Sequence, residues 1–199
     1  MVTKSERGEL TRARARVVGA KLFAEKGYRE TTTRDLAAAM NVTNGTFYYY
    51  FDSKEDLLYQ ISLEALSDVT AAVTSALDGE VDAEARIKTM IAAHMRTILG
   101  SPNSHKTALE VNWRSLAGET LEQVIAARRA NEELIQDEMA RAQASGLLRL
   151  NTEAKVFTLL LLNTMNWTIF WYRPDGELAI DDLIEEILRV FLDGSRASS

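Results

Sequence analysis

The stretch TTRDLAAAMNVTNGTFYYYFDSK, residues 32–54, restricts the fold of this chain more than any other part of it. Thr32, followed three residues later by Asp35, forms a capping box that can open a helix. The apolar residues after it recur at helical spacing and predict one buried face. Asn41 follows where the chain must reverse, because asparagine tolerates the left-handed backbone conformation that ends a helix. Thr43 can then cap a second short helix.

The second predicted helix has an inward and an outward face. Phe47 and Phe51 lie four residues apart and share the inward face. The spacing leaves the direction of Tyr50 open. An aromatic core stripe does not explain the three consecutive tyrosines, because a helix cannot bury them all on one face. The outward positions are Asn44, Gly45, Thr46, Tyr48 and Tyr49. This layout is typical of a helix-turn-helix, whose second helix offers its N-terminal residues to base edges in the DNA major groove.

Residues 14–58 resemble the N-terminal DNA-binding domain of the TetR family of bacterial transcriptional regulators. Four motifs carry the resemblance and stand in register: LFAEKGY, TTTRDLA, GTFYYYF and SKEDLL. The resemblance implies an all-α protein. A three-helix helix-turn-helix domain would precede a larger helical domain that dimerises and binds a small effector.

The resemblance also implies which residues contact DNA. In the family, the threonine that starts the second helix, the tyrosines late in the third and the lysine that opens the fourth contact phosphates, while early residues of the third helix meet bases. Carried over to this sequence, the expected DNA contacts are Thr33, Asn44, Gly45, Thr46, Tyr48, Tyr49, Tyr50 and Lys54. Asn44 stands where many members have lysine, and tyrosine stands late in this helix where many have histidine. The operator sequence is therefore left open.

The rest of the chain predicts helices separated by turn residues. We expect a flexible arm over residues 1–9, the DNA-binding domain over 10–55, the ligand-binding and dimerisation domain over 56–194 and a frayed tail over 195–199. Besides the two helices of the helix-turn-helix, helices are predicted at 10–26, 53–77, 83–99, 104–116, 118–145, 152–172 and 180–192, which makes about nine in all.

The net charge of −6 argues at first against a nucleic-acid partner. Residues 4–34, however, contain nine lysines and arginines against four glutamates, and a local basic patch is what the phosphate backbone senses. A solvated helix with salt-bridged flanks would explain this run by itself. Beside a helix-turn-helix, DNA binding is the better explanation.

The composition argues against several kinds of site. The chain has no cysteine, so neither a disulfide nor a thiolate metal site can form. The two histidines, His94 and His105, lie eleven residues apart across a predicted helix break, which is no metal-binding spacing. No catalytic nucleophile pattern or phosphate-binding loop is present. We therefore expect no enzymatic activity, no cofactor and no metal.

Neither the N-terminus nor the most apolar segment of the chain predicts a secreted or membrane protein. The N-terminus lacks the apolar core of a signal peptide. The most apolar stretch, residues 156–162, is too short to span a bilayer, which takes about 20 residues. We expect a cytoplasmic protein with no membrane partner.

The predicted helix 152–172 is the most apolar one, and Asn163 and Asn166 interrupt it. It can pack against a partner subunit with one face and line a ligand pocket with another. The segment NWTIFWYRPDGEL, residues 166–178, resembles a W-x-x-x-W-Y-R-P-x-G segment of TetR members that sense acyl-CoA thioesters. The candidate effector contacts are His94, Asn112, Trp113, Arg114, Arg128, Arg129, Asn163, Asn166 and Trp167.

Each of these candidates has a simpler structural explanation. Arginines suit the phosphates of coenzyme A, but an exposed, salt-bridged helix explains Arg128 and Arg129 equally well. A histidine on an apolar helix, such as His94, is more often a satisfied core residue than a ligand contact.

These features together predict a homodimeric, ligand-responsive transcriptional repressor. It would bind a pseudo-palindromic operator and be released by a small apolar effector of the acyl-CoA class. Two alternatives stay open. One is an activator or an effector-independent DNA-binding regulator, and the other is an enzyme or carrier built on a helical bundle. The regulated genes and the effector's identity lie beyond the sequence.

Overall fold

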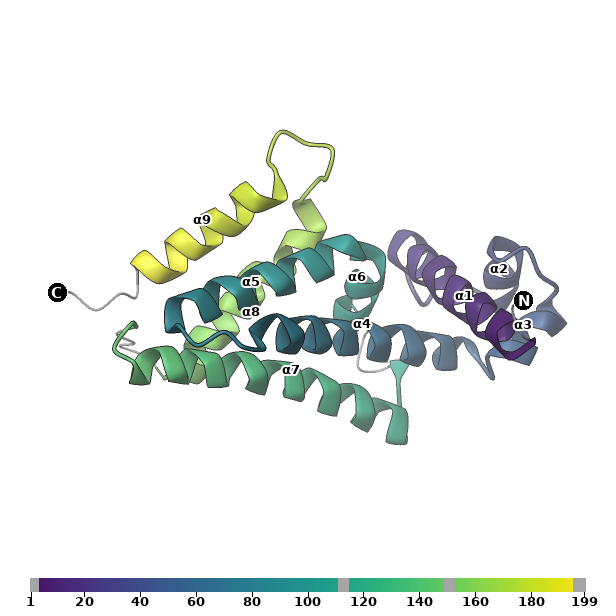
Figure 1. The fold of residues 1–199 in the computed structure, drawn as a ribbon. Coiled ribbons are helices and arrows are strands. Elements are labelled where there is room, and N and C mark those ends of the chain that lie inside the picture. Colours follow the sequence, from purple (N-terminus) through teal and green to yellow (C-terminus); the bar gives the residue numbers. More distant parts are fainter. Residues whose placement is uncertain (1–3, 111–114, 149–152, 195–199) are drawn as a thin grey trace. The chain divides into compact units, whose positions relative to one another are not determined.

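The structure, a computed structural model, describes residues 4–110, 115–148 and 153–194, with side chains from residue 12 onward. These ranges hold nine α-helices (Figure 1), which confirms the predicted all-α class. They are α1 (Lys4–Lys26), α2 (Thr33–Ala39), α3 (Asn44–Tyr50), α4 (Lys54–Leu77), α5 (Ala83–Gly100), α6 (Pro102–Glu110), α7 (Gly118–Ala144), α8 (Ala154–Trp171) and α9 (Ile180–Asp193).

Two helices differ clearly from their predicted bounds. α1 begins at Lys4, so residues 4–9, expected as a flexible arm, continue the helix. Several of these residues are glutamate or arginine, which are good helix formers. α6 begins at Pro102 and ends at Glu110, instead of spanning 104–116. Proline suits the first position of a helix, where the backbone N–H has no partner, so Pro102 opens this helix.

The chain divides into two compact units. The first comprises Met1–Leu66 and Pro102–Ile125, and the second comprises Ser67–Ser101 and Ala126–Ser199. The predicted domain boundary between residues 55 and 56 does not coincide with this division. The reason is that the first half of α4 contributes to the same core as α1, and that α6 packs against α1.

The core of the first unit is built from the inward faces of α1 to α4. Phe47 and Phe51, the pair expected to share a face, are 0% and 1% exposed. Leu36 of α2 and Leu57 of α4 belong to the same core. α1 and α4 approach closely at Gly19, where an added β-carbon would lie 2.8 Å from Leu57 Cδ2. The helix-turn-helix is thereby fixed on two long helices.

In the second unit, α5 packs against both α8 and α9 (Figure 1). An ion pair joins α5 to α7, because Arg86 Nε and Nη2 donate to the carboxylate of Glu138 at 2.7 and 2.8 Å. Glu138 is 5% exposed, so this ion pair is largely withdrawn from water. The buried face of α9 is one stripe: Leu183, Ile184, Ile187, Leu188 and Leu192.

The described helices include none that is both long and apolar enough to cross a membrane.

Candidate nucleic-acid interface and effector residues

The helix-turn-helix forms through local hydrogen bonds that the sequence predicts. Thr32 caps α2, because its hydroxyl accepts from the Asp35 amide at 3.1 Å and its own amide donates to the Asp35 carboxylate at 2.8 Å. Asn41 has the left-handed backbone conformation, with φ of 55°. Thr43 caps α3 by accepting from the Thr46 amide at 3.1 Å. The predicted capping box, reversal and second cap are all confirmed.

The outward face of α3 presents two different kinds of surface. At its start, Asn44 and Gly45 are exposed. The nearest side-chain or non-local backbone atom to a β-carbon on Gly45 would be Thr43 Oγ1 at 3.8 Å, so this part of the helix is open to close approach. Further along, Tyr48 and Tyr49 are 50% and 74% exposed. These four residues point outward, as the spacing predicted.

The other two α3 residues among the predicted DNA contacts are less accessible. Tyr50, whose direction the sequence left open, is half-buried and packs against the core of the first unit. Its ring makes an edge contact with Tyr49, with centroids 5.1 Å apart. The hydroxyl of Thr46 lies 2.9 Å from that of Thr43, so it takes part in the cap of α3.

The start of α2 and the face of α3 come together at Thr33 and Tyr48. The Tyr48 hydroxyl donates to Thr33 Oγ1 at 3.4 Å, a long hydrogen bond that joins the two helices. Hydroxyl groups at a helix N-terminus are good donors to phosphate oxygens. We group these two residues with the exposed residues of α3 as one candidate surface, called the α2–α3 surface below: Thr33, Asn44, Gly45, Tyr48 and Tyr49.

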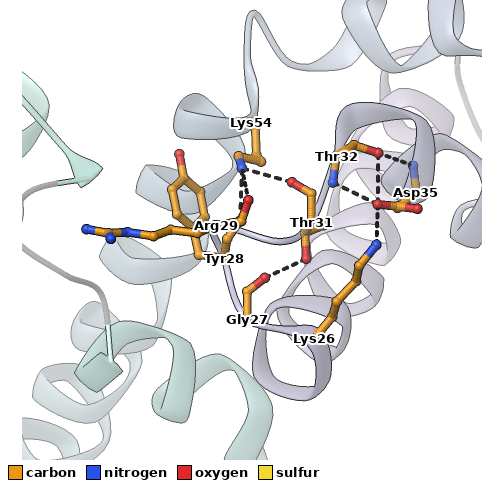
Figure 2. A network of polar contacts seen from close by, with 8 residues as sticks. All are labelled: Lys26, Gly27, Tyr28, Arg29, Thr31, Thr32, Asp35 and Lys54. Carbon is orange, nitrogen blue, oxygen red and sulfur yellow. Dashed lines mark hydrogen bonds and ion pairs between the residues drawn. The ribbon is translucent and has the colours of Figure 1, made fainter.

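Lys54, the first residue of α4, does not point freely into solvent. Its ammonium donates to the backbone carbonyls of Tyr28 at 2.9 Å and Thr31 at 2.8 Å (Figure 2). It also lies 4.3 Å from the centroid of the Tyr28 ring. Desolvation by burial lowers the pKa of Lys54, and the charge of Glu30 opposes this shift.

Part of the basic run on α1 is neutralised by ion pairs. Arg16 donates to the carboxylate of Glu64 at 2.6 and 3.1 Å. Lys26 lies 2.6 Å from the carboxylate of Asp35 (Figure 2). This contact, followed by hydrogen bonds from Thr32, holds the pKa of Asp35 well below its usual range. For Arg16 and Lys26, the alternative explanation of the basic run, a helix with salt-bridged flanks, is therefore correct.

Two of the candidate effector residues meet in the second unit. His94 of α5 and Asn166 of α8, 72 residues apart in sequence, are joined by a hydrogen bond of 2.9 Å between Nε2 and Oδ1. His94 is only 2% exposed. Sequence reasoning missed Thr158, a fully buried α8 residue whose hydroxyl has no hydrogen-bond partner among the described residues. Threonine is common on apolar helices, so no sequence signal singled it out.

The remaining effector candidates are dispersed. Asn163 is exposed on α8 and Trp167 is 64% exposed there, so neither joins His94. On α7, Arg129 is exposed and Arg128 is half-buried, and desolvation lowers the pKa of Arg128. Asn112, Trp113 and Arg114 lie outside the described residues.

Comparison with known proteins agrees with this architecture. Residues 17–61 match the model of the bacterial regulatory proteins of the tetR family, and residues 80–195 match that of a tetracyclin repressor-like C-terminal domain. The HTH-type transcriptional repressor KstR2 of Rhodococcus jostii (strain RHA1) is 25% identical over 177 residues, which cover 89% of this chain and 87% of that protein.

Two solved structures are also similar. The TetR family transcriptional regulator PfmR from Thermus thermophilus has a TM-score of 0.83 and 32% identity, and the match covers 90% of this chain and 97% of that one. AibR, solved in complex with isovaleryl coenzyme A and operator DNA, has a TM-score of 0.81 over 92% of this chain and 98% of its own. Its identity of 19% shows the shared fold alone. With both parts of the chain matched, the protein belongs to the TetR family of DNA-binding transcriptional regulators and is not an enzyme.

Proposed function

We propose that this TetR family regulator is a homodimeric repressor that binds a pseudo-palindromic operator and is released by an acyl-CoA thioester. The observation that carries the DNA-binding part is the α2–α3 surface, where an open helix start lies beside exposed hydroxyl groups. Such a regulator would act in the cytoplasm, where bacterial DNA lies.

The proposed contacts divide between bases and phosphates. Asn44 can donate to and accept from one adenine edge at once, and Gly45 leaves room for the helix to enter the groove. Thr33, Tyr48 and Tyr49 would donate to phosphate oxygens and set the register of the protein on the duplex. Thr46 and Tyr50 would reach DNA only from the edges of this surface, because both are half-buried.

An exposed apolar stripe on α8 supports the homodimer. Val156, Leu160, Trp167 and Trp171 are 44%, 56%, 64% and 48% exposed, although large apolar groups usually lie inside. Their spacing of four, seven and four residues puts them on one side of the helix. An exposed apolar patch of this kind marks an interface. A second copy of the chain would cover it, and a two-fold dimer would present two α3 helices to successive major grooves.

The proposed effector rests on three observations. The segment 166–178 resembles that of acyl-CoA-sensing members. AibR, whose fold this chain shares, binds isovaleryl coenzyme A. The second unit also holds a polar pair in which the buried His94 is hydrogen-bonded to the half-buried Asn166. A pocket with few, well-placed polar groups suits an acyl thioester, and Arg128 is a candidate partner for a coenzyme A phosphate.

The decisive experiment combines operator selection with ligand release. Purified protein would select fragments from its own genome, and the enriched DNA would then be titrated with acyl-CoAs of increasing chain length. We expect one palindromic sequence to be enriched and at least one acyl-CoA to release it. The matching free acid and free coenzyme A, added separately, should be inactive.

A pair of variants tests the site in the same assay. Asn166→Leu removes the partner of His94 and should weaken release by the acyl-CoA without weakening operator binding. Asn103→Leu, which changes an exposed asparagine on α6 and leaves α8 intact, is the control and should respond as wild type does. If an operator is enriched but no thioester releases it, the alternative of an effector-independent regulator would be favoured. If no DNA is enriched at all, operator binding would be refuted.

A further inference from the structure

The ammonium of Lys54 is enclosed by the turn that joins α1 to α2. Besides the carbonyls of Tyr28 and Thr31, the carbonyl of Arg29 lies 3.5 Å from Lys54 Nζ, at the limit for a hydrogen bond (Figure 2). A lysine ammonium has three N–H donors. The three carbonyls can use all of them, and the Tyr28 ring covers one side of the charge.

Reaching a phosphate would require Lys54 to leave these partners. The carbonyls of Tyr28 and Thr31 would lose a charged donor, and hydrogen bonds to charged groups are among the stronger ones in proteins. Thr31 is also 0% exposed, so water would not readily replace the lost donor at this turn. If the Lys54 ammonium exchanged two or three carbonyl acceptors for one phosphate oxygen, the net gain in hydrogen-bond energy would be small.

The turn that Lys54 holds leads directly into the α2–α3 surface. Its inner side is closed by Thr31, whose hydroxyl donates to the carbonyl of Gly27 at 2.7 Å. The next residue, Thr32, is the cap of α2, and its partner Asp35 is tied to Lys26 at the end of α1 (Figure 2). A change at the turn therefore displaces the first residues of α2.

From α2 the connection continues to the recognition helix. Thr33 follows the cap and accepts from the Tyr48 hydroxyl of α3. The chain of contacts runs from α4 through the turn to the residues proposed to meet phosphates. We infer that Lys54 is a positioning residue that holds the N-terminus of α2 in register for DNA, and is not itself a phosphate contact. This inference rests on the DNA contacts proposed above for the α2–α3 surface.

The salt dependence of binding separates the two roles. Each phosphate contact adds about 0.9 to the slope of log affinity against log salt concentration. Binding of the full chain to a mixed-sequence duplex about three helical turns long would be measured from about 50 to 200 mM salt. Lys54→Met should weaken binding about tenfold at every salt concentration, a typical coupling between linked sites, and leave the slope as in wild type.

Two further variants sharpen the result. Lys54→Arg keeps the charge, but a planar guanidinium does not fit three converging carbonyls; it should bind as weakly as Lys54→Met. A phosphate contact would instead keep most of its affinity in that variant. Lys88→Met removes an exposed lysine of the second unit whose ammonium lies 2.9 Å from the Glu84 carboxylate on the same helix, and should bind nearly as wild type does. The folded fraction of every variant would be checked by circular dichroism.

Hydrogen exchange supplies a readout that general destabilisation would not reproduce. The Asp35 amide, which donates to the Thr32 cap, should exchange faster in Lys54→Met, while amides in the middle of α1 keep their rates. A slope reduced by about 0.9 in Lys54→Met, together with retained binding in Lys54→Arg, would overturn the positioning role. Failure of the wild-type protein to bind the duplex at low salt would instead refute the proposed DNA contacts themselves.

Discussion

The exposed stripe of α8 allows dimerisation to be tested with one substitution, Trp167→Glu. Trp167 is 64% exposed in the single chain. A large aromatic side chain offers up to about 250 Å², so about 160 Å² of apolar surface is available to a partner. At about 25 cal/mol per Å², covering it completely contributes about 4 kcal/mol for each copy.

Buried area converts only partly into affinity, because association also costs rotational freedom and side-chain order. Counting half of the value for each of two symmetric copies leaves about 4 kcal/mol for the dimer, which corresponds to about a thousandfold in the dissociation constant. The buried glutamate adds a further penalty. We expect the variant to be monomeric at a micromolar concentration at which we expect wild type to be dimeric.

Sedimentation velocity across a dilution series measures this directly. Wild type should sediment as a species of twice the chain mass of 22.2 kDa, and Trp167→Glu as a single chain of 22.2 kDa. Val81→Glu is the matched control, because Val81 is 91% exposed but lies in the turn before α5 and is not part of α8. Circular dichroism would show that both variants stay helical. A dimeric Trp167→Glu variant, or a monomeric Val81→Glu variant, would refute the assignment of the interface to α8.

Three other substitutions test contacts described above. Gly45→Ala should raise the free energy of unfolding in urea by up to about 1 kcal/mol, the gain of alanine over glycine in a helix, yet weaken operator binding in a gel shift; equal binding would contradict close approach of DNA to α3. Arg86→Met removes both short hydrogen bonds to the buried Glu138 carboxylate, which keeps only Arg141 at 3.7 Å, and should cost about 3 kcal/mol or more in thermal unfolding. Adding Glu138→Leu should recover most of that loss, and a double variant as unstable as the single one would show that the ion pair is not the cause. Asp35→Asn should be less stable than wild type at pH 7, because Lys26 holds the pKa of the native carboxylate below the ordinary 3.8. The stability that the carboxylate contributes is lost as the pH falls below that value, so urea unfolding should show a smaller difference between the two proteins near pH 3 than at pH 7; a constant difference would exclude this linkage.

The helix-turn-helix could be predicted because its signals act over three or four residues. The Thr32 capping box, the left-handed Asn41 and the shared face of Phe47 and Phe51 each depend on neighbours within one helical turn. The backbone geometry and the hydrogen bonds of near neighbours follow directly from the order of the residues. The same reason explains why the helix count and most helix bounds followed from the pattern. The start of α6 was predicted at residue 104 instead of Pro102, because a proline breaks the interior of a helix but suits its first position.

Contacts between distant segments depended on how the helices pack. The turn enclosing Lys54 lies 23 to 26 residues away in sequence, and a pattern of residue types shows only a lysine at a helix start. His94 and Asn166 were both named as candidates, but nothing in the sequence paired them across 72 residues, nor Arg86 with Glu138 across 52. Trp167 lies next to Asn166 in sequence and is exposed, whereas Thr168, one residue further, is 1% exposed. The orientation of whole helices decides which polar groups meet. That orientation minimises the apolar area exposed over the entire core, and each polar side chain can then bond only to the partners that this packing brings within reach.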